Sequence, residues 1–209
     1  MAKAKATLAK INVLGTIRLL KLAKKHKVSR VIIPTTPDVT WLNPYKITKA
    51  AIEKFSQLFS KNFNLEVVCL KLGNIYGPRE RFLDSNSKAP FNYQKIIPTI
   101  IMETLKGNKF DIYGSGDQRS EYIYINDVVE IFNRALSSKK NLSGLVINVG
   151  KGKNLSVNEI VNSIEKVWKK KINCNYIKMR PGEHHVEISL EPTSLKKYLD
   201  YKLKWNLDI

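Results

Sequence analysis

The segment that decides the fold is residues 29–71, which read SRVIIPTTPDVTWLNPYKITKAAIEKFSQLFSKNFNLEVVCLK. Its two ends, residues 29–34 and 65–71, are short apolar runs of the kind that a parallel sheet buries on both faces. Residues 43–62 lie between them with apolar side chains at helical spacing and Pro44 at the first helical position. A strand, a helix and a second strand in this order predict a crossover unit of an α/β protein.

Helices and strands continue to alternate on both sides of this unit. Residues 8–27, LAKINVLGTIRLLKLAKKHK, place their apolar side chains on one helical stripe. Further helices are expected at IIPTIIMETLKG, NDVVEIFNRALSS, SVNEIVNSIEKVWKK and TSLKKYL, and strands at FDIYG, EYIYI, GLVINVG and CNYIKM. The fold class is therefore α/β, with a partial parallel sheet in residues 1–78 and a smaller α/β lobe in residues 79–209 that interleaves with it.

The composition is that of a folded chain. Of 209 residues 43% are hydrophobic and 26% charged, which argues against wholesale disorder, and no apolar run reaches the roughly 18 residues of a membrane span. The basic start lacks the apolar core and cleavage site of a signal peptide, so we expect a cytoplasmic protein. The two cysteines, Cys69 and Cys174, are too few for a disulfide framework and lack metal-ligand spacing, so no metal site is expected.

The net charge of +18 raises the alternative of nucleic-acid binding, because a basic surface releases counterions from phosphate. Most of the 36 basic residues are lysines scattered along the whole chain, whereas proteins that read base edges rely on arginine. A lysine-rich solvated surface is therefore the favoured interpretation, and nucleic acid is an unlikely partner.

Tyr45 and Lys49 form a Y-x-x-x-K pair, whose side chains share one face of a helix. An ammonium beside a phenol favours the phenolate and lowers the tyrosine pKa, which suits a general base for a sugar hydroxyl. The spacing is common by chance and recurs at Tyr198 and Lys202, so its context decides. The first pair follows a strand that ends in Thr36, and ligands bind at the carboxyl ends of parallel strands.

Seven motifs in order make the sequence recognisable. They are INVLGTIRLLKLAKKHKVSRVII, TTPDV, PYKITKAAIEKF, LKLGNIYGP, IYGSGDQRSEYIYINDVVE, INVGKGKNLSVNEIV and RPGE. With them the chain resembles the nucleotide-sugar epimerase/dehydratase family, the extended short-chain dehydrogenases/reductases, over nearly its whole length. The resemblance implies a Rossmann-like domain, NAD as cofactor and a nucleotide-linked sugar as substrate.

The resemblance also implies roles for individual residues at the reacting end. Tyr45 takes the place of the catalytic acid/base, and Lys49 is its partner and also bonds the nicotinamide ribose. Thr36 supplies the third catalytic side chain, a hydroxyl, and Asn12 lies where the family has a cofactor-side asparagine.

At the nucleotide end, four side chains match residues that hold the substrate. Asn74 would contact the nucleotide phosphates, Tyr113 would stack on the base, and Arg180 would clamp the pyrophosphate with its planar fork. Arg119 is the candidate for a further phosphate contact, although it stands one residue before the family's position, which Ser120 occupies.

The sequence departs from the family pattern in its first half. No strand, G-x-x-G-x-x-G turn and helix precede residue 8, so residues 1–78 correspond to the second half of an NAD-binding domain, with strands 29–34 and 65–71 of its sheet. The segment between Thr36 and Tyr45 is also short. We therefore expect a truncated epimerase/dehydratase-like protein.

Two alternatives follow for what such a chain does. It either acts on a nucleotide-linked sugar, or it is a catalytically inactive subunit that holds the nucleotide sugar and pairs with a complete relative. The apolar helices at 8–27 and 43–62 predict a homo-oligomer through these helices, or association with a complementary N-terminal half.

Overall fold

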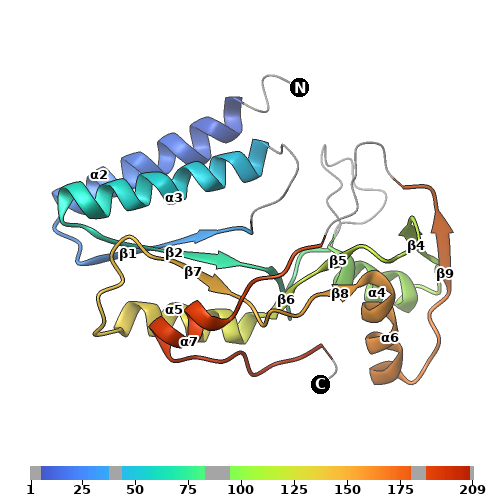
Figure 1. Cartoon of the computed structure of the whole chain (residues 1–209). Helices are drawn as coiled ribbons and strands as arrows, with labels where there is room; N and C mark the ends of the chain where they lie inside the picture. The colour runs from blue at the N-terminus through green and yellow to red at the C-terminus, as the bar shows by residue number, and fades with distance from the viewer. Residues whose placement is uncertain (1–5, 38–43, 83–94, 180–186, 208–209) are drawn as a thin grey trace.

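A parallel three-stranded sheet forms the centre of the larger lobe in a computed structural model, which describes residues 6–37, 44–82, 95–179 and 187–207 (Figure 1). Its strands are β1 (Arg30–Thr35), β2 (Glu66–Leu72) and β7 (Val146–Val149), in the order β1-β2-β7. The sequence predicts only the first two of these strands in the sheet, and this was wrong. The apolar run of β7 adds to the free side of β2.

Helices cover both faces of the sheet (Figure 1). Helices α2 (Gly15–Lys25) and α3 (Pro44–Phe63) lie on one face, and α5 (Ile125–Ser137) and α7 (Thr193–Leu199) lie on the other. Side chains of β2 alternate between the two resulting cores, as the pleat of a strand requires. A mixed α/β fold with a parallel sheet is thereby confirmed.

The first helix differs from its sequence prediction. One continuous helix is expected over residues 8–27, but the structure has a π-helical segment, η1 (Ala9–Leu14), that passes into α2 at Gly15. The π-helical segment contains Asn12, whose side chain is bonded to helix α3. The segment therefore lies against the first turns of α3.

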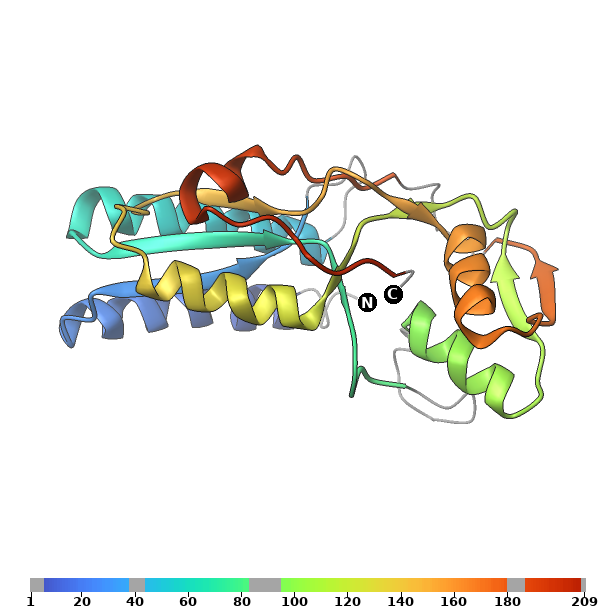
Figure 2. The same cartoon turned by 90° about the horizontal axis from the view of Figure 1, so that it is seen from below.

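The smaller lobe pairs two helices with short strands (Figure 2). Helix α4 (Ile96–Leu105) lies beside α6 (Val157–Trp168), which Ser156 and Glu159 begin with a capping box. Two strand pairs complete the lobe: β4 (Phe110–Tyr113) with β9 (Cys174–Ile177), and β5 (Arg119–Ser120) with β8 (Leu155–Ser156).

A short parallel pair connects the lobes. Strand β3 (Asn74–Tyr76) runs beside β6 (Tyr122–Tyr124), although the sequence predicts only a turn at residues 73–78. Gly73 permits this pairing, because a Cβ there would lie 2.9 Å from the carbonyl oxygen of Glu121. Asn74 is thus fixed on a strand rather than in a loop.

The sheet ends at β1 on one side, within the described residues. None of the helices in those same ranges is long and apolar enough to cross a membrane. The boundary between lobes at residue 78 stays a prediction, and β7 and α5 show that later residues contribute to the larger lobe.

Candidate active site

Tyr45 and Lys49 lie on the first two turns of α3, beside the carboxyl end of β1. The Lys49 Nζ lies 5.8 Å from the centroid of the Tyr45 ring and donates a hydrogen bond to the carbonyl oxygen of Pro34 at 3.0 Å. The structure therefore brings the two side chains together at the end of the sheet where ligands of open α/β folds bind.

The pKa of Tyr45 does not follow the expected direction. Burial raises the pKa of the Tyr45 phenol, and burial lowers the pKa of Lys49, partly opposed by the nearby Cys69. The expectation that Lys49 lowers the tyrosine pKa is therefore wrong for the described residues. The Lys49 ammonium faces the Tyr45 ring and the Pro34 carbonyl. Desolvation of the phenol therefore has a larger effect on the Tyr45 pKa than the charge of Lys49.

Thr36 is bonded to a lysine that the sequence does not single out. The Lys46 Nζ donates to the Thr36 Oγ1 at 2.6 Å and to the carbonyl oxygen of Pro37 at 2.9 Å. A hydroxyl has one proton to donate, and here its oxygen already accepts from an ammonium. The Thr36 proton therefore remains available for a ligand oxygen or for Tyr45.

Asn12, in η1, is bonded to the same helix. Its Nδ2 donates to the Thr48 Oγ1 at 2.9 Å, and the Thr48 hydroxyl donates to the carbonyl oxygen of Tyr45 at 2.7 Å. Asn12 thus supports the first turn of α3, which carries Tyr45. Its role beside a cofactor stays a prediction.

A hollow lined by both polar and apolar side chains lies beside Asn74. It measures about 250 Å³, and Lys95 and Tyr122 also line it. Burial raises the pKa of Glu80 in its wall, opposed by Lys95, and burial together with Glu80 raises the pKa of Tyr122 to about 12. Lys95 is a cation beside Asn74 that sequence reasoning missed, because it only precedes α4 in a polar stretch.

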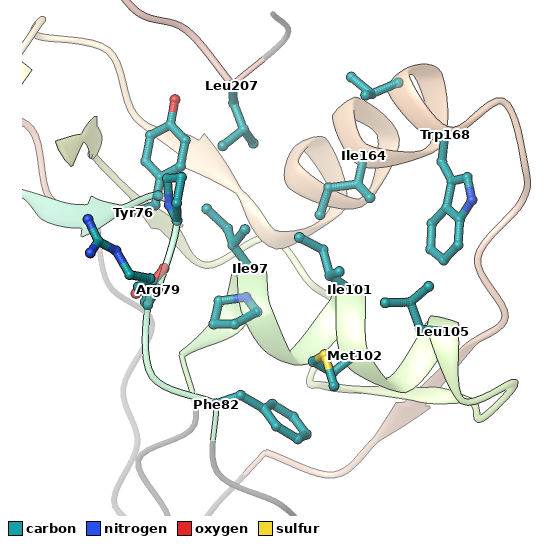
Figure 3. A pocket seen from close by; sticks show the side chains of 15 residues that line it. Tyr76, Arg79, Phe82, Ile97, Ile101, Met102, Leu105, Ile164, Trp168 and Leu207 are labelled. Carbon is teal, nitrogen blue, oxygen red and sulfur yellow. The ribbon is translucent and has the colours of Figure 1, made fainter. Parts of the chain in front are cut away.

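A larger and apolar cavity of about 700 Å³ adjoins this hollow, with which it shares Tyr76, Glu80 and Ile97. Figure 3 shows the side chains of α4 and α6 facing each other across it. The apolar side chains that line it include Phe82, Ile101, Met102, Leu105, Ile164, Trp168 and Leu207.

Of the remaining predicted residues, Tyr113 and Arg119 do not line the hollow beside Asn74 and Arg180 is outside the described ranges. Tyr113 ends β4 and is not among the residues that line either hollow. The Arg119 guanidinium bonds Asn154 and the Glu159 carboxylate within the smaller lobe. Arg180 lies outside the described residues. Substrate binding by these three side chains stays a prediction.

No group of three or more potential metal ligands occurs in the part of the chain that the structure describes. The described side chains at the end of β1 include a phenol, a hydroxyl and two ammonium groups. Such a set can move a proton at a hydroxyl and stabilise the negative charge that develops there.

Comparison of the sequence with known protein families identifies a match. The model described as "NAD dependent epimerase/dehydratase family" matches residues 2–150. The chain is 27% identical over 189 residues to a putative UDP-glucose 4-epimerase of Methanocaldococcus jannaschii, and 30% identical over 165 residues to a dTDP-D-glucose 4,6-dehydratase of Dictyostelium discoideum. These alignments cover 83% and 66% of this chain, and 58% and 35% of the relatives.

Solved structures agree with the fold. The chain superposes on UDP-glucuronic acid 4-epimerase from Bacillus cereus, in complex with UDP-glucuronic acid and NAD, with a TM-score of 0.79 and 26% identity. That match covers 94% of this chain and 63% of the other. The chain also superposes on a UDP-glucose 4-epimerase from Thermotoga maritima, with a TM-score of 0.83 and 24% identity. That match covers 99% of this chain and 68% of the other, and at this identity it supports the fold only.

Proposed function

The chain belongs to the NAD dependent epimerase/dehydratase family, and from this premise we propose that its residues form the acid/base end and the nucleotide-sugar lobe of an enzyme that epimerises or dehydrates a nucleotide-linked sugar. The observation that carries the proposal is the position of Tyr45 and Lys49 on α3 at the carboxyl end of β1, where Lys49 bonds Pro34 and Lys46 of the same helix bonds Thr36. The relatives named for UDP- and dTDP-sugars support the same substrate class.

The residues present fit the nicotinamide end of NAD. The Lys49 ammonium has three donors, of which one reaches the Pro34 carbonyl, and the ring of Tyr45 lies beside it. These side chains would hold the ribose, and NAD when bound accepts and returns a hydride. The 209 residues contain no G-x-x-G-x-x-G turn for the pyrophosphate, so that end requires other residues.

The protein's own contribution is to move one proton. In this proposal Tyr45 removes the proton of a sugar hydroxyl as that carbon is oxidised, and returns a proton when the hydroxyl is restored. The Thr36 hydroxyl donates its proton to the same sugar oxygen. Its own oxygen accepts from Lys46, which leaves that proton free to donate. Burial of Tyr45 opposes formation of the phenolate, so the proton shared with Thr36 and the substrate oxygen is the part of the site that this proposal depends on.

The nucleotide is proposed to lie in the hollow beside Asn74. Lys95 supplies a positive charge there, and the Asn74 amide supplies donors, which suits a diphosphate. Ile96 and Ile97 line the same hollow, and their apolar surface suits a base.

The edge of β1 is proposed as the place where the NAD-binding site is completed. Beside this edge lies an apolar hollow of about 560 Å³, lined by Leu19, Leu22 and Val31. A complementary half with a parallel strand and a glycine-rich turn would cover it. Homo-oligomerisation through α2 and α3 is the alternative use of the same leucines.

A catalytically inactive nucleotide-sugar-binding protein is the second candidate. It is favoured by the raised pKa of Tyr45, which disfavours a phenolate, and by the Arg119 guanidinium being bonded within its lobe. Both candidates share the hollow beside Asn74, and they differ only in turnover.

The test is to incubate the full chain with NAD and a panel of UDP-, dTDP- and GDP-sugars, with and without a separately produced glycine-rich half of a matched relative. NMR of the sugar signals detects an epimer or a dehydrated product. We expect product in the presence of the added half and loss of product with Tyr45→Phe. Binding of nucleotide sugar without product under both conditions selects the second candidate, and absence of binding contradicts both.

A further inference from the structure

We propose that Glu53 is a positioning residue, which sets the end of β1 and helix α3 in the arrangement that places Lys49 and Tyr45 at the site. This inference rests on the proposed function for its purpose. The contacts on which it depends lie below the site, in the core between α3 and the sheet.

Three side chains from three elements meet at Glu53. The Thr35 Oγ1 on β1 donates to one carboxylate oxygen at 2.6 Å, and the Lys71 Nζ on β2 lies 3.3 Å from the other. All three residues are buried, with exposures of 9% for Glu53, 5% for Thr35 and 8% for Lys71. Both oxygens of the carboxylate are therefore engaged by the sheet.

The two partners of Glu53 are themselves paired in the sheet. Thr35 is opposite Lys71 in the parallel register of β1 and β2, at the last rung of that ladder. Both side chains point to the α3 face, as do Ile33 and Cys69 two residues earlier on each strand. Glu53 thus contacts the final strand pair immediately before Thr36.

Apolar packing alone would define the position of α3 relative to β1 less precisely. The side chains of α3 that face the sheet include Ile52 and Phe59, and apolar contacts are non-directional. A buried ion pair is a weak source of stability, because desolvation offsets most of its attraction. The hydrogen bond from Thr35 to Glu53 is directional, however, so its contribution here is to fix α3 relative to the end of β1.

The helix transmits this position to the site. Lys49 precedes Glu53 by four residues, so both lie on the same helix face, and Tyr45 precedes Lys49 by four more. The Lys49 ammonium bonds the carbonyl of Pro34, which directly precedes Thr35 on β1. A shift of α3 against β1 would therefore separate Lys49 from Pro34 and expose its ammonium.

Two native groups report such a shift without any need for turnover. Burial lowers the pKa of Lys49, so greater exposure raises it. The Cys69 thiol is buried on the same face, and burial raises its pKa to about 11, so its alkylation requires local opening. A Cys174→Ser background leaves Cys69 as the single thiol.

The experiment compares three variants of the full chain. Glu53→Leu with Lys71→Met removes both charges and the acceptor of Thr35. Glu53→Gln with Lys71→Met also removes both charges but keeps an amide oxygen for Thr35. The control is Glu130→Gln, which breaks the half-exposed pair of Glu130 with Arg134 on α5.

We expect the Leu/Met variant to raise the Lys49 pKa, followed by NMR of labelled lysines, and to speed Cys69 alkylation about tenfold, the effect of a modest loss in opening free energy. The Gln/Met variant and the control should leave both values near wild type. The rescue by glutamine separates positioning from mere loss of a buried pair.

Unchanged Lys49 titration and unchanged Cys69 alkylation in the Leu/Met variant would overturn the proposal. If that variant does not fold, Thr35→Val removes only the hydroxyl donor and must give the same two changes, or the proposal fails. Failure of the proposed function has a different signature, because it would appear as absence of turnover in the wild-type chain with these readouts intact.

Discussion

Tyr45→Phe tests the chemistry at the residue scale. The change removes the phenolic oxygen and keeps the ring beside Lys49, so helix α3 should be undisturbed. If Tyr45 is the acid/base, turnover by the complemented chain falls by about 10²–10⁴-fold, the usual contribution of such a group. Nucleotide-sugar affinity should stay unchanged, measured by titration calorimetry. Turnover that survives the substitution would remove Tyr45 from this role.

The pH dependence of turnover follows from the raised pKa of Tyr45. Because the phenolate is the base and burial raises the phenol pKa, the reactive fraction is small at neutral pH and grows as pH rises towards that pKa. Initial rates measured as a function of pH should therefore increase on the alkaline side. The rate should not reach a plateau until the pH passes the ordinary range for a tyrosine, because burial shifts the Tyr45 pKa upward. Initial rates that stay constant or fall above neutral pH would contradict a Tyr45 phenolate as the base.

Sequence reasoning identifies the residues of the site whose pattern is local. Tyr45, Lys49 and Thr36 were found from the Y-x-x-x-K spacing and the preceding strand. Lys46 is not predicted, because the Y-x-x-x-K pattern allows any residue at its position. Its contact with Thr36 depends on how α3 packs beside β1, which no local pattern specifies. Glu53 was missed because a charged residue on an amphipathic helix ordinarily faces water.

At the scale of elements, Asp127 fixes the C-terminal segment to α5. This fully buried carboxylate accepts from the Tyr201 hydroxyl at 2.7 Å and from the backbone N–H groups of Lys204 and Trp205 at 3.0 and 3.1 Å. Asp127→Asn puts an amide N–H against these donors, so we expect a loss of about 2–4 kcal/mol. Thermal unfolding should show this as a Tm lower by roughly 5–15 °C.

The matched control is Asp200→Asn, on an exposed residue in the left-handed region with φ of 46°, which asparagine tolerates. Its Tm should stay close to that of the wild type. Equal effects of the two substitutions would mean that the Asp127 contacts do not anchor the segment.

Most helices and strands of the fold could be predicted from the periodic spacing of apolar residues. Helices α3, α5 and α6 and strands β1, β2 and β7 lie within a few residues of their expected places, because long periodic segments carry their own signal. The assembly of the sheet could not be predicted as reliably. Strand β7 pairs with β2 across a gap of more than 70 residues, and β3 pairs with β6, and no local pattern specifies such partners.

At the scale of the whole molecule, the exposed apolar side chains of η1 and α2 predict association. Ile11, Leu14, Leu19 and Leu22 have between 49% and 65% of their surface exposed, opposite the buried Leu20. An apolar face of this kind usually marks an interface. We expect the chain to self-associate or to bind a complementary half, and Leu19→Glu with Leu22→Glu to abolish either.

Light scattering after size exclusion measures this directly. The control is Leu136→Glu on α5, which is as exposed as Ile11 but lies on the other face of the sheet. It should leave the mass distribution unchanged. A wild-type chain that is a stable monomer and does not bind the added glycine-rich half of a relative would contradict the prediction.

The most direct test of the central claim, that these residues form a nucleotide-sugar site, is calorimetric titration of the full chain with UDP-glucose, dTDP-glucose and UDP-glucuronic acid. Because the net charge is +18, tripolyphosphate is titrated under the same conditions to measure unspecific attraction. The account predicts saturable one-to-one binding of at least one nucleotide sugar, tighter than tripolyphosphate and weakened by Lys95→Met in the hollow beside Asn74. Binding no tighter than tripolyphosphate, or unaffected by that substitution, would contradict it.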